Sequence, residues 1–127
     1  MNALAPYFWI GIGGFLGANA RYLVSRLCAD LFGARLPWGT FAVNVTGSFV
    51  LGFLLTLITH RMIPHGDQFR LAIGVGFIGA YTTFSTFEFE THSLLDSGQW
   101  PMALANVLGS VLVGFIAVRL GIAAARI

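Results

Sequence analysis

The sequence predicts an all-α membrane protein with four transmembrane helices, the third of which is broken. Composition is the first reason, because 57% of the 127 residues are hydrophobic and 9% are charged, whereas a soluble domain carries about 25% charged residues. The second reason is that the few charges leave four long apolar stretches with short connections between them. The third is a glycine-rich and hydroxyl-rich segment, residues 74–90, that is unlike an ordinary membrane helix.

Four spans account for the apolar stretches and form a single domain over residues 1–127. A helix of about 20 residues rises about 30 Å, which is enough to cross the hydrocarbon core of a bilayer. The connections are short and rich in turn-forming residues, so no separate soluble domain is expected. The predicted spans are residues 4–27, 37–60, 70–95 and 101–124.

The first span carries one charge in its body, Arg21, and no acidic residue. Gly13 and Gly17 precede it at intervals of four, a spacing that lets helix backbones approach closely, although glycine is also common in membrane helices without such a contact. The three residues share a helix face, which points Arg21 to where backbones meet. Arg21 is either an interfacial anchor that reaches the lipid headgroups or a cation at a vestibule, where it would raise the local anion concentration.

The second span has a polar stripe of Thr40, Asn44 and Ser48, which lie four residues apart on one face. A serine or threonine hydroxyl usually bonds to a carbonyl of its own helix. An asparagine amide cannot satisfy all its groups in that way and is costly in lipid. Asn44 is therefore expected to face a polar cavity or a neighbouring helix, and a purely structural interhelical bond is a serious alternative.

The third span contains the sequence GVGFIGAYTTFSTFEFE at residues 74–90. Its glycines lower helix propensity, and interrupted membrane helices present freed carbonyls to ions. A cation could therefore be held by carbonyls near Gly79 and Thr82. Phe84 and Phe87 lie three apart and share a face, and the positive edge of a phenyl ring can attract a small anion. The alternative is that both rings face lipid or the core.

The fourth span has a weaker polar line of Asn106 and Ser110, continued by Gly114.

The cysteine count and the charge distribution exclude several classes of function. Cys28 is the single cysteine, so neither an intrachain disulfide nor a cysteine-based metal cluster is possible. No basic face exists that would bind nucleic acid.

The arginines are divided almost evenly between the two sides that four spans would create. This weak bias cannot fix one orientation by the positive-inside rule. A chain that inserts both ways could pair with its own inverted copy, or a small count could fail to report a single orientation, and topology alone leaves these about even. Four arginines fall on the side of the termini and three on the other: Arg61, Arg70, Arg119 and Arg126, against Arg21, Arg26 and Arg35.

Three segments resemble the motifs of one family of membrane proteins. Residues 13–22 (GGFLGANARY), 38–52 (WGTFAVNVTGSFVLG) and 76–90 (GFIGAYTTFSTFEFE) are similar to those of the Fluc (CrcB-type) bacterial fluoride channels. The order, the spacing and the total length agree, and the resemblance covers essentially the whole chain. The TTFSTF core at residues 82–87 is the specific signature.

The resemblance implies an antiparallel, dual-topology homodimer in the bacterial cytoplasmic (inner) membrane that exports fluoride passively, with no enzymatic step. Two pores would lie at the subunit interface, and a structural Na⁺ would bind main-chain carbonyls of Gly79 and Thr82. Arg21, Thr40 and Glu90 would be vestibule or structural residues. The implied pore residues are Phe84, Phe87, Asn44, Thr83, Ser85, Thr86, Ser110 and Asn106.

The chain departs from the family pattern at three positions. Position 106 is asparagine where some relatives carry tyrosine, and position 114 is glycine where some carry a hydroxyl residue. Glu88 stands where small hydroxyl residues are familiar, and no physical role follows for it from the sequence.

Two other function classes compete with a channel. A small four-helix multidrug exporter coupled to protons needs a carboxylate within the membrane, and the first span has none. A non-transporting membrane subunit would explain the small residues on the helix faces. It would not explain hydroxyl residues clustered beside two phenylalanines.

Overall fold

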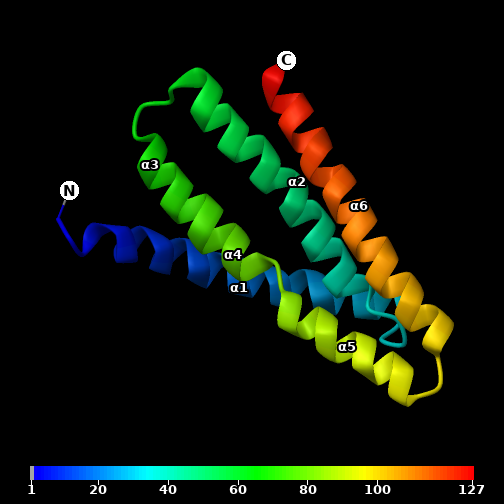
Figure 1. Ribbon diagram of the computed structural model, residues 1–127. Coiled ribbons are helices and arrows are strands. Elements are labelled where there is room, and N and C mark those ends of the chain that lie inside the picture. Colours follow the sequence, from blue (N-terminus) through cyan, green and yellow to red (C-terminus); the bar gives the residue numbers. More distant parts are fainter. Residues whose placement is uncertain (1) are drawn as a thin grey trace.

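The computed structural model describes residues 2–127, which are almost entirely helical and contain no strand (Figure 1). Four helical segments follow one another, and the third is interrupted. This confirms the predicted all-α architecture of four helices. The elements are α1 (Ala5–Phe32), α2 (Trp38–Arg61), α3 (Gly66–Phe69), η1 (Arg70–Ile78), α4 (Gly79–Tyr81), α5 (Phe84–Asp96) and α6 (Trp100–Arg126).

The first helix is longer than the predicted span, which ended at residue 27. It continues to Phe32 and ends at Gly33, whose φ of 81° is a positive angle that glycine adopts without strain. The Gly33 N–H caps the helix by bonding to the Ala29 carbonyl at 2.9 Å. The longer helix includes Asp30, an exposed residue near its end. The expectation that the first helix lacks an acidic residue therefore holds for residues 4–27 and is wrong for the whole helix.

Helices α2 and α6 lie side by side along most of their length (Figure 1). Glycines allow this close approach. A Cβ added at Gly52 would lie 2.6 Å from the Val118 carbonyl oxygen, and one at Gly121 would overlap the Phe49 carbonyl. Both helices are long and apolar enough to cross a membrane. The close packing of α2 on α6 fixes the position of the helix that carries Thr40, Asn44 and Ser48.

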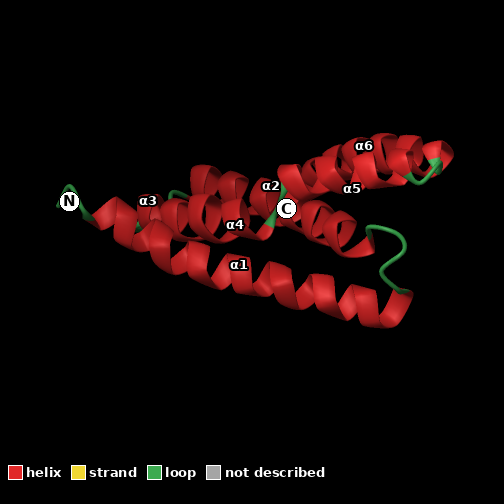
Figure 2. Ribbon diagram, turned by 90° about the horizontal axis from the view of Figure 1, so that it is seen from below, coloured by secondary structure: helices red, strands yellow, loops and turns green. Residues whose placement is uncertain are grey.

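Helix α1 packs against η1 and α4 on the other side of the molecule (Figure 2). Gly13 lies against the Ala72 carbonyl and Gly17 against the Phe77 carbonyl, so a side chain at either would overlap backbone. In return, a Cβ at Gly76 would lie 2.6 Å from the Ile10 carbonyl oxygen. The close contact predicted for Gly13 and Gly17 is confirmed, within a single chain.

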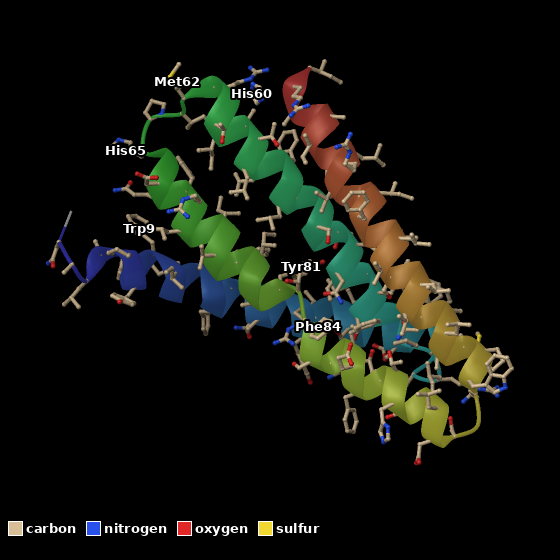
Figure 3. All side chains as sticks on the ribbon, in the orientation of Figure 1. Trp9, His60, Met62, His65, Tyr81 and Phe84 are labelled. Atoms are coloured by element: carbon tan, nitrogen blue, oxygen red, sulfur yellow. The ribbon has the colours of Figure 1, made fainter. Side chains whose placement is uncertain are left out.

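The outer surface of the helices is largely apolar (Figure 3). Phe15 and Leu31 of α1 and Phe115 of α6 are among many large apolar side chains that are more than 60% exposed. The fully enclosed core is small by comparison, with Val43 at its centre. Exposed apolar faces on helices of this length are typical of a membrane protein. Both termini and the α2–α3 connection lie toward one end, and the other two connections toward the opposite end (Figure 1).

Candidate functional site at the broken helix

The interruption of the third helix falls at two threonines. α4 ends at Tyr81, Thr82 (φ −83°, ψ 157°) and Thr83 (φ −150°, ψ 123°) are extended, and α5 begins at Phe84. In Figure 3 the labelled Tyr81 and Phe84 stand on either side of the break. Gly79 has ordinary helical angles. Gly74 and Gly76 lie in the preceding segment η1, which is a π-helix, so the interruption itself is built from the two threonines and not from glycines.

Asn44 of α2 makes two hydrogen bonds to the backbone of Thr83, the second residue of the break. Its Oδ1 accepts from the Thr83 N–H at 2.8 Å, and its Nδ2 donates to the Thr83 carbonyl at 3.0 Å. Both a polar cavity and a helix partner were possible for Asn44 from the sequence. The structure gives it a partner through the backbone of Thr83, and the same residue also lines a recess beside the break.

The hydrogen bonds at the break remove two N–H groups from the helical ladder. In an α-helix each N–H bonds to the carbonyl four residues earlier. The Thr83 N–H, which would bond to Gly79, bonds to Asn44, and the Thr86 N–H, which would bond to Thr82, bonds to the Thr83 hydroxyl at 3.3 Å. The carbonyls of Gly79 and Thr82 thereby lose their ladder donors. These are the two carbonyls that the family resemblance implied as cation ligands.

Phe84 and Phe87 differ sharply in exposure. Their rings contact each other, with centroids 5.9 Å apart and planes at 46°. Phe87 is buried, whereas Phe84 is 73% exposed, so most of its surface is not covered by this chain. Thr86 is half-buried between the two, and Ser85 is exposed. The two predicted pore rings thus contact each other, and only the Phe84 ring is exposed on the surface of the single chain.

One recess lies beside the break on the α2 side. It measures about 240 Å³. Asn44 and Ser48 contribute polar groups to it, and Phe84 contributes a ring. The Ser48 hydroxyl donates to the Asn44 carbonyl, within its own helix, at 2.6 Å. This recess combines an amide, hydroxyls and a phenyl ring without any formal charge.

A second recess, of about 400 Å³, lies on the α1 side. Arg21, Thr40 and Thr86 line it, and Thr83 lines both recesses. The broken segment therefore lies between a recess without charged side chains and a recess that is lined by the positively charged Arg21. Arg21 is half-buried at this position, and its roles as a headgroup anchor and as a vestibule cation both stay predictions.

Thr40 and Glu90 are joined across 50 residues of sequence. The buried Thr40 hydroxyl donates to Glu90 Oε1 at 2.9 Å. Glu90 Oε2 is buried and has no hydrogen-bond partner among residues 2–127. A buried carboxylate oxygen without a partner is costly. This hydrogen bond is a second link between α2 and the segment after the break, in addition to the two bonds of Asn44 to Thr83, which we call the Asn44 clamp.

The polar line of α6 contacts α5 away from the two recesses. Asn106 Nδ2 donates to the Thr91 hydroxyl at 3.0 Å, and Ser110 donates to Asn106 Oδ1 at 3.4 Å. Thr91 in turn donates to the Phe87 carbonyl at 2.8 Å. Thr91 could not be predicted from the sequence, because a single threonine bonded within its own helix gives no periodic signal.

Tyr81 was also missed as a contributor to the site. Its hydroxyl lies 2.9 Å from the Thr46 hydroxyl of α2, and its ring stacks on Phe77 at a centroid distance of 5.7 Å. The adjacent TTFSTF core is conspicuous in the sequence, whereas a lone tyrosine in a membrane helix is not. Within residues 2–127 no group of three His, Cys, Asp or Glu side chains gathers as a metal site.

Comparison with known proteins identifies the family. The family model described as CrcB-like protein, Camphor Resistance (CrcB), matches residues 8–122. The chain belongs to the CrcB-like family. Among CrcB-like relatives, a protein of Solibacter usitatus named fluoride-specific ion channel FluC is 48% identical over 120 residues, covering 94% of this chain and 98% of the relative.

Other CrcB-like relatives carry the same name. The Magnetococcus marinus protein is 44% identical over 120 residues, which is 94% of this chain and 96% of that protein. The protein of Roseiflexus sp. is 44% identical over 127 residues, which is 100% of this chain and 98% of that protein. The resemblance seen in the three sequence motifs is confirmed over the whole length.

Proposed function

We propose that the chain forms a fluoride-selective channel that exports fluoride passively across the bacterial cytoplasmic membrane and protects the cell from fluoride. The names of its CrcB-like relatives support this. The observation that carries it is the uncharged recess at the break, where Asn44, Ser48 and Phe84 meet. Such a site offers donors and a ring edge to a small anion without a fixed cation that would trap it.

Conduction would need binding sites that an ion can both enter and leave. Arg21 in the second recess attracts anions toward the break, and hydroxyls of Thr83 and Thr86 stand between the two recesses. Phe84 and Phe87 line the narrow part of the path, and no covalent step is involved. Ser85, Asn106 and Ser110 complete the proposed pore residues, with the latter two acting through α5.

The functional unit is an antiparallel homodimer with two pores. The support is that Phe84 is 73% exposed, so one wall of the proposed path is missing from a single chain. A Cβ added at Gly79 would likewise meet no atom within 4 Å. An inverted second copy would cover both residues, and the weak arginine bias permits insertion in both orientations.

A structural Na⁺ would bind where the two copies meet. The carbonyls of Gly79 and Thr82 fit it, because both have lost their ladder donors to side chains. Neutral carbonyl oxygens at an interrupted helix suit an alkali cation. Two carbonyls from each copy would supply the ligands, and the ion would add positive charge between the two copies.

Fluoride efflux from liposomes that contain the purified protein tests the proposal. Vesicles loaded with potassium fluoride and treated with a potassium ionophore should release fluoride into a fluoride-free medium. Vesicles loaded with potassium chloride should retain their anion. Equal release of both anions, or no release of fluoride above that from protein-free vesicles, would refute the proposed function.

A further inference from the structure

Thr83 is the joint of the broken helix, and its N–H has left the helical ladder. The residue is extended, so its own N–H and C=O project to the same side, as in a strand. In a sheet a neighbouring strand would pair with both groups, but residues 2–127 contain no strand. A backbone group without a partner in a membrane costs several kcal/mol, on the order of the loss of a buried hydrogen bond. A side chain must take the place of the missing strand.

The Asn44 amide has the matching pair of groups. It presents an acceptor and a donor side by side, and it meets the Thr83 N–H at 2.8 Å and the Thr83 carbonyl at 3.0 Å. An aspartate could accept but not donate when ionised, and a hydroxyl could not span both groups. Helix α2, which carries Asn44, is itself anchored to α6 through Gly52 and Gly121.

We propose that Asn44 is a positioning residue that keeps the third helix broken. It binds the Thr83 N–H that would otherwise close the helix onto the Gly79 carbonyl. Asn44 thereby fixes the direction in which α5 leaves the break, and with it the position of Phe84. It also keeps the Gly79 carbonyl free, so one side chain links the two proposed ion sites. This inference rests on the proposed function only for its effect on ion flux.

The direct test measures the two carbonyls by infrared spectroscopy. Heavy carbon and oxygen isotopes are placed in the carbonyl of Thr83, or of Gly79, in the full-length protein. In Asn44→Leu the Thr83 band should move to higher frequency, because its bond to Nδ2 is lost. The Gly79 band should move to lower frequency, because the Thr83 N–H becomes its donor. If either band stays at the wild-type position in folded Asn44→Leu protein, the proposal is overturned.

Thr59→Val is the matched control on the same helix. Thr59 is exposed and bonds to the Leu55 carbonyl of its own helix at 2.8 Å. Both bands should keep their wild-type frequencies in this variant. A shift as large as in Asn44→Leu would mean that the bands report a general change in α2, and it would overturn the assignment.

A single-atom change covers the case in which Asn44→Leu does not fold. Replacing Thr83 by its α-hydroxy acid converts the N–H into an ester oxygen and leaves Asn44 and the threonine side chain unchanged. Fluoride efflux should fall by about fivefold or more, which corresponds to the loss of one hydrogen bond. Unchanged efflux would mean that Asn44 acts on the anion without the Thr83 backbone. The carbonyl bands do not depend on conduction, so a protein without fluoride flux would refute the proposed function alone.

Discussion

Asn106 of α6 donates a hydrogen bond to the Thr91 hydroxyl of α5 at 3.0 Å, and that hydroxyl donates to the Phe87 carbonyl at 2.8 Å. The fourth helix therefore reaches the pair of rings through backbone rather than by lining an open recess. The Thr40–Glu90 bond is a second side-chain attachment of α5, and Asn44 binds Thr83 directly before the helix begins. The short half-helix that carries both phenylalanines is thus held from two neighbouring helices.

Removing the Asn106–Thr91 bond should destabilise the protein moderately. We expect Asn106→Leu to lower its stability by about 1 kcal/mol, a typical net value for one hydrogen bond. Thr91→Val should cost a similar amount, and the double variant less than the sum, because the two residues share one bond. Thermal unfolding in detergent measures all three. Ser93→Ala, which removes an exposed hydroxyl bonded within α5, is the control, and strict additivity would contradict the contact.

The glycine contacts between α1 and η1 should tolerate no side chain. Gly13→Ala would drive a Cβ into the Ala72 carbonyl, and overpacking of this kind costs about 1–3 kcal/mol or more. Gly109→Ala on α6 is the matched change, since a Cβ there meets no atom within 4 Å. The yield of monodisperse protein in size-exclusion chromatography should fall for Gly13→Ala alone. Equal yields for the two variants would argue against the backbone contact.

The hydrogen bond between Thr40 and Glu90 should contribute more to the free energy of unfolding with a carboxylate at position 90 than with an amide. Thr40→Val leaves both carboxyl oxygens without a protein donor, which we expect to cost about 1–3 kcal/mol. In the Glu90→Gln background the same change should cost less, because the amide oxygen is a weaker acceptor than a carboxylate. A double-mutant cycle of thermal unfolding measures the difference. A cost of Thr40→Val that is identical in both backgrounds would exclude the coupling.

The two phenylalanines should separate function from stability. Phe84 is 73% exposed in one chain and Phe87 is 6% exposed. Phe84→Ile should abolish fluoride efflux and leave the unfolding temperature close to that of the wild type. Phe87→Ile should lower the unfolding temperature, because it changes the shape of a buried side chain, at a cost of about 1 kcal/mol. Wild-type efflux from Phe84→Ile would show that its ring does not line the path.

The sequence predicts much of this arrangement because its chemistry is periodic. The charge-free stretches indicate four helices, and the stripe of Thr40, Asn44 and Ser48 marks the polar face of α2. The glycine and hydroxyl run at residues 74–90 predicts an interrupted helix. Gly13 and Gly17 predict a close approach, which is confirmed against η1.

The remaining features depend on tertiary contacts that leave no local pattern. Gly76 lies within the π-helix η1 with α1 packed directly on it, and the break comes further along the chain, so low helix propensity does not by itself locate the break. The break falls at Thr82 and Thr83 because Asn44, 39 residues away, supplies the partner for the Thr83 backbone. Helix α1 passes the predicted end of its span because no breaker precedes Gly33, and it then includes Asp30.

A reversal potential measures directly whether the protein conducts fluoride selectively. The purified protein is placed in a planar bilayer with a fluoride salt on one side and the chloride salt of the same cation on the other. The current should reverse at a strongly displaced voltage, of the sign expected when fluoride alone crosses. A reversal near zero, or a current that persists when chloride replaces fluoride on both sides, would show that the protein is not a fluoride-selective channel.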